Sequence, residues 1–370
     1  MSEQPSVRSP LGEARGIFGY RAELEEAVFE FQRREYPNRP PHRIPDNWRW
    51  MFVASAARLG ITPLVWLYLK KGEVVAHQGA LPVRLHVSGK ELVTGWFVET
   101  MAGQAVRGTP IGPMLIKKAL EDLPLNLSLG QTPQMRALQF ALGWRQVCSL
   151  PSYVFVSGYR MGLRHKLPAG AAEAAAAALA LLHGLRRRRG RRAPPPGVTF
   201  GHVDRFTDEH DVLWKRMAAT CSCAVVRDAS YLNWKYVDRP FAAFMRTEMR
   251  DRGELIGVIV TMLRDPTEVY SYRRGILVDL VVPLDRPDYV SMLIDAAVTD
   301  LQRLGAQTVT CHAWSPALTG VLERLGFARR EPRFHFLLAA GGEGEQLPEL
   351  LRPESWFLTQ GDSDADAYTG

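Results

Sequence analysis

Cysteine is scarce in this sequence: its 370 residues include only Cys148, Cys221, Cys223 and Cys311. So few and so scattered, they cannot form the disulfide framework of a small secreted domain, and they fit thiols kept reduced, as in a cytoplasm. Cys221 and Cys223 lie two residues apart, but no second pair or histidine cluster accompanies them to complete a zinc site. We therefore expect a cytoplasmic protein that binds no metal.

Long apolar runs are also absent. Residues 1–16 contain no hydrophobic stretch of signal-peptide length. The most apolar segment, 169–185, is mostly alanine, includes Glu173, and is shorter than the roughly 20 apolar residues of a membrane span. Its composition predicts a helix, and the sequence predicts no transmembrane segment.

A distributed basic surface is the third absence. The net charge is +7, but the run from Arg186 to Arg192 supplies six of these charges, which leaves +1 for the rest of the chain. This distribution argues against a specific nucleic-acid-binding face on a folded domain. Three prolines follow the run, so residues 164–197 are a candidate linker. The arginines could contact acidic membrane headgroups, or they could form a solvated spacer.

The chain does contain enough apolar residues for folded domains, with 46% hydrophobic and 23% charged residues. Its length exceeds that of one compact core, so two domains are expected. Two segments repeat each other: TPQMRALQFALGWR from Thr132 and SPALTGVLERLGFAR from Ser315. Each reads as an N-cap, a proline at the first helical position, an amphipathic helix and a glycine stop, at Gly143 and Gly326.

The repeat extends in both directions along the chain. Matching segments are the helical patterns 22–35 and 208–219, the strand pairs 63–87 and 242–263, the central strands 93–101 and 274–282, the strands 126–130 and 308–314, and the edge-like strands 151–156 and 332–338. This order predicts a duplicated α/β unit, with domains at 15–163 and 198–340. Residues 341–370 read as a solvated acidic tail, because GDSDAD at 361–366 begins like a calcium loop but is not completed as one.

The segment GQAVRGTPIGP at 103–113 lies between a predicted strand and a predicted helix. Backbone N–H groups at a helix start attract anions, glycine allows close approach, and arginine adds a charged hydrogen bond. Pro110 and Pro113 lack an N–H and cannot contribute. The candidate phosphate ligands are Arg107, Gly108, Thr109, Ile111 and Gly112. The alternative is a strand-to-helix turn that binds no ligand.

The order of elements and this loop resemble the GNAT acyltransferases (Gcn5-related N-acetyltransferases), in which Arg/Gln-x-x-Gly-x-Gly/Ala follows the central strand. The resemblance implies an α/β (α+β) fold of two tandem GNAT-like domains, each a mixed, mostly antiparallel sheet flanked by helices. It also implies that the loop holds the pyrophosphate of acyl-CoA, with acetyl-CoA as the expected co-substrate. A backbone amide of the central strand, which we assign to Val98, would polarise the thioester carbonyl.

The second copy departs from this loop. It has PLDRPD at 283–288, where two carboxylates repel a diphosphate and two prolines remove donors. We therefore expect no equivalent acyl-CoA site there, and the second domain could serve as a wall, a lid or a pseudo-dimer partner.

The resemblance further implies a carboxylate base on the central strand, and Glu99 is the acid at that position. The alternative for Glu99 is an ion-paired strand residue. The family's usual general acid is a tyrosine four residues before the Gly-aromatic pair, where this sequence has Gln139 in the first copy and Leu322 in the second. This departure leaves open whether the chain is catalytic.

The second copy offers further candidates. Asp279, inside an apolar strand, is either an acid–base residue or a buried, hydrogen-bonded carboxylate. Tyr231 and Trp234 in RDASYLNWKYVDRP, with His312, could line an acceptor pocket. The alternatives are a helix packed on the sheet and a core histidine.

Three functions remain open. The first is an acyl-CoA-dependent acyltransferase that acts by direct transfer on an amine or hydroxyl of a sugar or another small polar acceptor. With the segment YLNWKY at 231–236 and the ending WFLTQGD at 356–362, the chain resembles bacterial tandem GNAT-like proteins linked to polysaccharide biosynthesis. The second is a non-catalytic module that binds CoA or scaffolds a partner. The third is a Fem-type aminoacyl transferase, although the chain has no counterpart of that family's coiled-coil arm.

Overall fold

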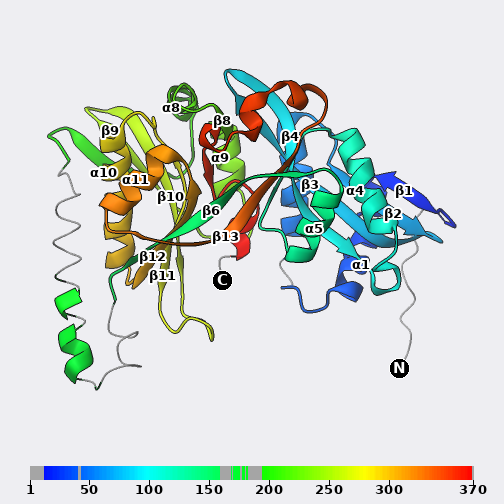
Figure 1. The fold of residues 1–370 in the computed structure, drawn as a ribbon, viewed down its shortest axis with the longest axis horizontal. Helices are drawn as coiled ribbons and strands as arrows, with labels where there is room; N and C mark the ends of the chain where they lie inside the picture. Colours follow the sequence, from blue (N-terminus) through cyan, green and yellow to red (C-terminus); the bar gives the residue numbers. More distant parts are fainter. Residues whose placement is uncertain are drawn as a thin grey trace.

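The computed structural model describes residues 12–40, 43–158, 168, 170–175, 177–179, 181 and 194–368. Residues up to 158 are called the first half below, and residues from 194 the second half. In Figure 1 the first half lies on the right, the second half lies on the left, and two long strands cross between them.

The described residues form fourteen named strands: β1 (Gly16–Gly19), β2 (Val65–Lys70), β3 (Glu73–Val87), β4 (Lys90–Ala102), β5 (Asn126–Leu129), β6 (Arg145–Val156), β7 (Val198–His202), β8 (Cys223–Val225), β9 (Met245–Asp251), β10 (Glu254–Arg264), β11 (Arg274–Val281), β12 (Thr308–Trp314), β13 (Ala328–Ala339) and β14 (Leu358–Thr359). The α-helices are α1 (Glu25–Glu35), α2 (Asp46–Arg49), α3 (Ser55–Leu59), α4 (Ile111–Asp122), α5 (Pro133–Ala141), α8 (Asp208–Ala218), α9 (Ala229–Tyr236), α10 (Pro287–Arg303) and α11 (Pro316–Arg324). A π-helical turn, η3 (Trp50–Ala54), joins α2 to α3.

The strands join into one sheet in the order β1-β2-β3-β4-β5-β13-β6-β12-β11-β10-β9-β7, with β14 beside β12 and β8 beside β3. Along this path β4–β5 and β11–β12 are parallel, and the other described neighbours are antiparallel. The expected mixed, mostly antiparallel sheet flanked by helices is therefore confirmed.

Tight turns connect the predicted strand pairs. Lys71 and Gly72 between β2 and β3 both have positive φ, and so do Arg252 and Gly253 between β9 and β10. Two consecutive residues of this kind are the requirement of the type I′ turn, whose twist matches that of an antiparallel pair. The charged-residue-plus-glycine pattern thus specifies both hairpins.

The two halves exchange their last strands. β13, from the second half, pairs with β5 and β6 of the first half, and β6 in turn pairs with β12. Figure 1 shows β6 and β13 crossing the middle of the molecule. The prediction of edge-like strands at 151–156 and 332–338 was wrong, because both segments lie inside the sheet. Their prolines, Pro151 and Pro332, fall at one irregularity in the β6–β13 register, where the missing N–H groups break no ladder hydrogen bond.

The repeated helices α5 and α11 end as predicted but begin differently. The Thr132 side chain accepts a hydrogen bond from the Met135 N–H at 3.2 Å, whereas the Ser315 side chain makes no capping hydrogen bond. Gly143 (φ +88°) and Gly326 (φ +90°) adopt the left-handed conformation that ends each helix.

A pair of tryptophans joins the halves at their centre. The rings of Trp50, in η3, and Trp234, in α9, are stacked with centroids 4.8 Å apart. Each indole N–H donates to the other residue's carbonyl oxygen, at 2.8 and 3.1 Å. Both rings are buried, so these reciprocal bonds satisfy groups that water cannot reach.

The C-terminal segment, defined as residues 356–366, is not a solvated acidic tail. Asp362 and Asp366 are almost completely buried, as are the apolar residues Trp356, Phe357 and Leu358 that precede them. The sequence prediction failed because the acidic residues find arginine partners far away in the chain, which an isolated tail sequence does not reveal.

Other expectations concern the alanine-rich helix, the arginine run, the cysteines, membrane spans and metal binding. The described residues of 170–181 are helical, as predicted, whereas the arginine run 186–192 lies outside the described residues. The four cysteines are unbonded. No helix within the described ranges is long and apolar enough to cross a bilayer. Within the same ranges, no cluster of three or more histidine, cysteine or acidic side chains could hold a metal ion.

Replacing Trp234 with phenylalanine tests the central pair. The ring contact is kept, but the buried Trp50 carbonyl loses its donor, so we expect the free energy of unfolding to fall by about 1–3 kcal/mol. Urea denaturation measures this value. The control Val269→Ala, at a position 80% exposed, should change it by less than about 0.5 kcal/mol. An unchanged stability of Trp234→Phe would contradict a role of this hydrogen bond in joining the halves.

Candidate functional site

The central strand of the first half is interrupted by a bulge. His77 pairs with Met101 and Gly79 with Val98, so β4 has one more residue than β3 in this interval. Glu99, within the bulge, has φ +56°, a value uncommon for any residue with a side chain. Such bulges redirect side chains and backbone groups, and they are frequent beside functional sites.

A cavity of about 560 Å³, called the first-half cavity, adjoins this bulge. The parallel pairing of β4 with β5 covers only Gly95 and Trp96 of β4. Beyond it, the cavity is lined by the end of β4, by the loop and helix α4 that follow β4, and by the start of α5, which follows β5. Its apolar lining includes Val106, Leu115, Ile116, Met135 and Leu138, and its polar lining includes Gln78, Thr100, Arg107 and Thr132. The space therefore suits a ligand with a long apolar part and a polar or charged end.

The predicted phosphate loop forms one wall of this cavity and contributes two open N–H groups. The N–H of Thr109 donates to the Val106 carbonyl at 3.3 Å, and the N–H of Ile111 to the Thr109 hydroxyl at 3.4 Å. The N–H groups of Gly108 and Gly112 have no hydrogen-bond acceptor in the described part of the chain. Gly108 has φ +76°, which only glycine adopts readily. Two of the four predicted amide donors are thus available, and one of them lies in the first turn of α4.

Arg107 is held in place by its Nε atom and its ring contact. Nε donates to the Ala102 carbonyl at 3.0 Å, and the guanidinium carbon lies 5.6 Å from the centroid of the Tyr36 ring. The terminal nitrogens of Arg107 have no hydrogen-bond partner among the residues described. A preorganised guanidinium of this kind is suited to a phosphate oxygen.

Glu99 turns away from the first-half cavity. Its carboxylate accepts a hydrogen bond from Arg39 at 2.6 Å, and Arg43 lies 3.9 Å away. Burial would raise the pKa of Glu99, but the hydrogen bond and the charge of Arg39, together with Arg43, lower it below the usual range. A carboxylate whose pKa two arginines hold below the usual range is a poor general base, so the geometry supports the alternative of an ion-paired strand residue.

His77 fixes the backbone of the bulge. Its Nδ1 lies 2.7 Å from the Glu99 carbonyl oxygen, and its Nε2 lies 3.4 Å from the Trp48 indole nitrogen. Because the indole can only donate, Nε2 is the acceptor and Nδ1 carries the proton. Burial lowers the pKa of His77, so the imidazole stays neutral and its N–H supports the unusual conformation of Glu99.

Two other first-half positions considered in the sequence analysis, Val98 and Gln139, are not in the cavity lining. Val98 is 6% exposed and lies in the strand just before the bulge. Gln139, at the position of the family's tyrosine, is buried and donates to the Ser128 hydroxyl at 3.0 Å. In the second half Leu322 is fully buried. Neither Gln139 nor Leu322 can donate a proton to a departing thiolate.

The second half repeats the bulge but closes the space beside it. β11 has one extra residue opposite β10, between Leu277 and Asp279. Asp279 is buried, pairs with Arg227 at 3.0 Å, and accepts hydrogen bonds from Tyr236 and Thr359 at 2.8 and 2.9 Å. The geometry therefore supports the alternative of a buried, hydrogen-bonded carboxylate, because each carboxylate oxygen of Asp279 is already bonded within the core.

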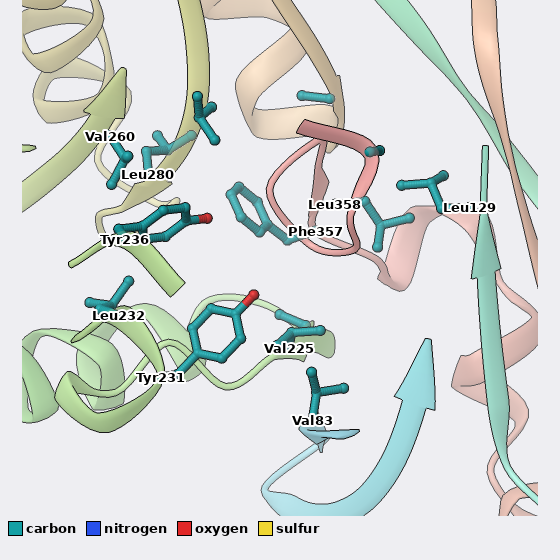
Figure 2. Packing of buried hydrophobic residues seen from close by; sticks show 14 of the residues in the cluster. Val83, Leu129, Val225, Tyr231, Leu232, Tyr236, Val260, Leu280, Phe357 and Leu358 are labelled. Carbon is teal, nitrogen blue, oxygen red and sulfur yellow. The ribbon is translucent and has the colours of Figure 1, made fainter. Parts of the chain in front are cut away.

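The C-terminal segment occupies the region between β11 and β12. β14 pairs with β12, the Gln360 N–H donates to the His312 carbonyl, and the Gly361 N–H donates to the Val278 carbonyl of β11. Residues of the segment thus bond to both strands. Figure 2 shows Phe357 beside Tyr231 and Tyr236 in this core. Among the described residues, the C-terminal segment therefore occupies the position that corresponds to the first-half cavity.

Tyr231, Trp234 and His312 belong to the core, so their assignment to an acceptor pocket is corrected. Tyr231 and Trp234 are 1% and 5% exposed, and the packed-helix alternative describes them. His312 contacts the Phe334 ring, and burial, with a smaller effect of Arg333, lowers its pKa to about 4. The sequence could not distinguish these cases because aromatic residues are typical of both pockets and cores.

Several important residues were missed from the sequence. Arg39 and Arg43 lie in a proline-rich segment, where nothing indicated that Glu99 was their partner. Arg227 follows the apolar run CAVV, and an arginine directly after such a run could have suggested a buried ion pair. Asp364 was counted as part of a solvated tail.

Comparison with profiles of known protein families and with curated proteins finds no match. Solved structures do share the fold. N-myristoyltransferase of Saccharomyces cerevisiae with bound myristoyl-CoA is 14% identical with a TM-score of 0.55, and the alignment covers 91% of this chain and 85% of that chain. A GCN5-related N-acetyltransferase from Anabaena variabilis is 12% identical with a TM-score of 0.59, covering 88% and 72%. Another from Kribbella flavida is 12% identical with a TM-score of 0.58, covering 89% and 71%. These similarities confirm the GNAT-like fold.

Substitution of Gly361 tests how tightly the C-terminal segment fits. A Cβ at this position would overlap the Tyr236 hydroxyl, so we expect Gly361→Ala to lower the free energy of unfolding by about 1–3 kcal/mol. Tyr236→Phe removes that hydroxyl and costs the hydrogen bond to Asp279.

In the double variant the overlap with the hydroxyl is relieved. The double variant should therefore lose less unfolding free energy than the sum of the two single losses, by at least about 0.5 kcal/mol. Chemical denaturation of the four proteins gives this coupling. Strict additivity would show that Gly361 and Tyr236 do not meet in solution.

Proposed function

We propose that this protein transfers an acyl group from acyl-CoA to an amine or hydroxyl of a small polar acceptor, such as a sugar. The observation that carries the proposal is the combination of the β4 bulge, the adjoining first-half cavity and the two open N–H groups of Gly108 and Gly112. Together they offer a place for a thioester, for an extended chain and for a diphosphate. The shared fold with acyl-CoA-dependent enzymes supports this reading.

The donor is proposed to lie with its pyrophosphate at the loop 107–112. Arg107 supplies a positive charge, and the N-terminus of α4 adds its dipole to the open amides. The apolar lining from α4 and α5 would contact the pantetheine arm and the acyl chain. Acetyl-CoA is the donor expected from the sequence, and the size of the cavity also admits a longer chain.

Transfer requires loss of a proton from the acceptor, and Asp364 is the proposed base. It is 7% exposed, and its carboxylate has no hydrogen bond from any described residue. Burial, with the nearby charge of Glu99, raises its pKa to about 6, although Arg43 and Lys235 oppose this. A carboxyl with such a pKa can accept a proton near neutral pH. As the acceptor's nitrogen or oxygen bonds to the acyl carbon, its proton passes to Asp364, the C–S bond breaks and CoA leaves as the thiolate.

The broader context is proposed as well. We infer two tandem GNAT-like units with boundaries near 163 and 198, acting in a reducing cytoplasm, and a role in bacterial polysaccharide biosynthesis fits a sugar acceptor. A non-catalytic CoA-binding module is the second candidate, favoured by Gln139 at the position of the family's acid. Turnover separates the two candidates, since both require binding of acyl-CoA.

Donor binding can be tested by thermal unfolding with acetyl-CoA and octanoyl-CoA. Saturating donor should raise Tm by about 2–5 °C. Arg107→Glu and Gly112→Asp should each abolish the shift. A Cβ at position 112 would meet no atom within 4 Å, and an aspartate suits a helix start, so the variant should fold while repelling the diphosphate.

The matched control is Arg303→Glu, which makes the same charge change on α10, where the side chain is 75% exposed. Its shift should equal that of the wild type. Absence of any shift in the wild type with either donor would refute the proposed donor site.

Asp364→Asn tests the base through stability and activity together. Because the folded state holds this proton more tightly than the unfolded chain, the stability it contributes is present below pH 4 and lost as the pH rises through 6. The amide cannot ionise, so at pH 8 the variant should exceed the wild type by about 1–3 kcal/mol, with no difference at pH 4. Its kcat should nevertheless fall by about 100-fold or more.

Denaturation curves between pH 4 and 8 and steady-state thiol release provide the two measurements. Asp285→Asn, at an exposed position before α10, should alter neither. If Asp364→Asn is as active as the wild type, Asp364 is excluded as the base. Equal destabilisation of Asp364→Asn at pH 4 and pH 8 would indicate a structural role alone.

A further inference from the structure

A second cavity, of about 510 Å³, lies at the junction of the two halves and is called the junction cavity. The first half contributes Arg43 and Asn47, from the segment before α2 and its first turn. The second half contributes the loop 239–243 and the end of β10 at 262–264, and the C-terminal segment contributes Asp366. The junction cavity therefore exists only when both halves and the C-terminal segment are in place.

Three guanidinium groups and one carboxylate line the junction cavity. Arg239 donates to the Asp366 carboxylate at 2.7 Å, and its guanidinium lies over the Trp50 ring at 4.7 Å. On the first-half side, the Arg43 guanidinium forms an ion pair with the Glu99 carboxylate. Among the ionisable side chains of the lining, Arg43, Arg239 and Arg264 outnumber Asp366, so the surface of the cavity is positively charged.

Arg264 is the least satisfied of these groups. Its Nη2 reaches the Asp366 carbonyl only at 3.4 Å, and its buried Nε has no hydrogen-bond partner among the described residues. Burial lowers the pKa of Arg264, and the neighbouring Arg239 and Arg274 lower it further against the effect of Asp366. A partly buried cation with a buried, unused donor is costly, and a bound anion would reduce that cost.

The junction cavity is connected to the β4 bulge through one residue. Arg43 lines the cavity and lies 3.9 Å from the carboxylate of Glu99 in the bulge. Thr100 and Met101, which follow Glu99 in β4, line the first-half cavity. The bulge is thus bordered by the proposed donor site on one side and by the arginine-lined space on the other.

The loop at the edge of the junction cavity presents an exposed aromatic side chain. Phe241 is 69% exposed and has φ +59°. Positive φ is strained for a large residue, and strain of this kind is concentrated at binding sites. Phe241 offers a contact for an apolar part of a molecule whose charged part lies deeper, near Arg239 and Arg264.

We propose that the junction cavity binds the acyl acceptor through an anionic group, a carboxylate or a phosphate, held by Arg239 and Arg264. The acceptor's amine or hydroxyl then faces the β4 bulge. This inference rests on the proposed acyl transfer for the identity of the bound molecule, whereas the anion site itself can be tested without any acyl donor.

Three small amines of similar size distinguish the possibilities: O-phosphoethanolamine, which carries a phosphate; β-alanine, which carries a carboxylate; and ethanolamine, which has no anionic group. Calorimetric titration of the full chain without acyl-CoA should give at least 10-fold tighter binding of one anionic amine than of ethanolamine. If O-phosphoethanolamine binds more tightly than β-alanine, the site is a phosphate site. If β-alanine binds more tightly, it is a carboxylate site. Equal affinity for all three amines, or no binding of any of them, would overturn the proposal.

Arg264→Gln and Arg239→Gln should each weaken the anionic ligand by 10-fold or more and leave ethanolamine unchanged. If Arg264→Gln fails to fold, Arg264→Lys keeps the charge but loses the planar donor set, and should still weaken binding. The control Arg273→Gln removes an exposed arginine paired with Asp265, outside the cavity lining, and should bind like the wild type. Unchanged affinity in both Arg264 and Arg239 variants would overturn the assignment.

Thiol release with acyl-CoA then separates this inference from the proposed function. Anion binding without turnover of any amine would leave the site standing and refute the transferase. Turnover of ethanolamine as fast as of the anionic amines, unaffected by Arg264→Gln, would support the transferase and refute the anion site.

Discussion

Arg227 is the residue on which the arrangement of the second half depends. Its guanidinium is fully buried and pairs with Asp279 of β11 and with Asp362 of the C-terminal segment, at 3.0 and 2.7 Å. Burial alone would lower the pKa of Arg227, but these two carboxylates raise it, so the charge is retained in the core. Removing one partner of such a buried group typically costs about 3–5 kcal/mol, because the remaining charge is left unpaired. One side chain thus fixes the end of the chain to the centre of the sheet.

This anchoring explains why two similar halves differ in structure beside their central strands. Each has a bulged central strand next to a parallel partner. In the first half the space that follows contains a cavity with open amides, whereas in the second half it holds Gln360, Gly361 and their neighbours. The same segment then places Asp364 near Arg43 of the first half, and Asp366 in an ion pair with Arg239 of the second half. Described residues of the second half, among them Arg239 and Arg264, therefore line the junction cavity.

The sequence was informative wherever structure follows from local pattern. Helix stops at glycine, the strand pairs 63–87 and 242–263, and the order of strands along the chain could all be predicted, because each depends on residues close together in the chain. The loop 107–112 was located for the same reason. Partners across long distances could not be predicted: Glu99 with Arg39, Asp279 with Arg227, and Trp50 with Trp234 are separated by many residues. The roles of Glu99, Asp279, Tyr231 and His312 depended on such partners, and the sequence alone could not assign them.

The exchange of β6 and β13 also has a consequence for how the chain is made. β6 and β5 flank the position of β13, so during synthesis the first half waits with unpaired strand edges until the end of the second half has emerged. At about 5–20 residues per second, the interval from Val156 to Ala328 lasts on the order of ten to thirty seconds. Unpaired edges invite pairing with other nascent chains, so this period is the one in which the protein is most exposed to aggregation. A ribosome that stalls within the second half would therefore release a chain with neither sheet edge closed, and translation speed becomes a determinant of yield.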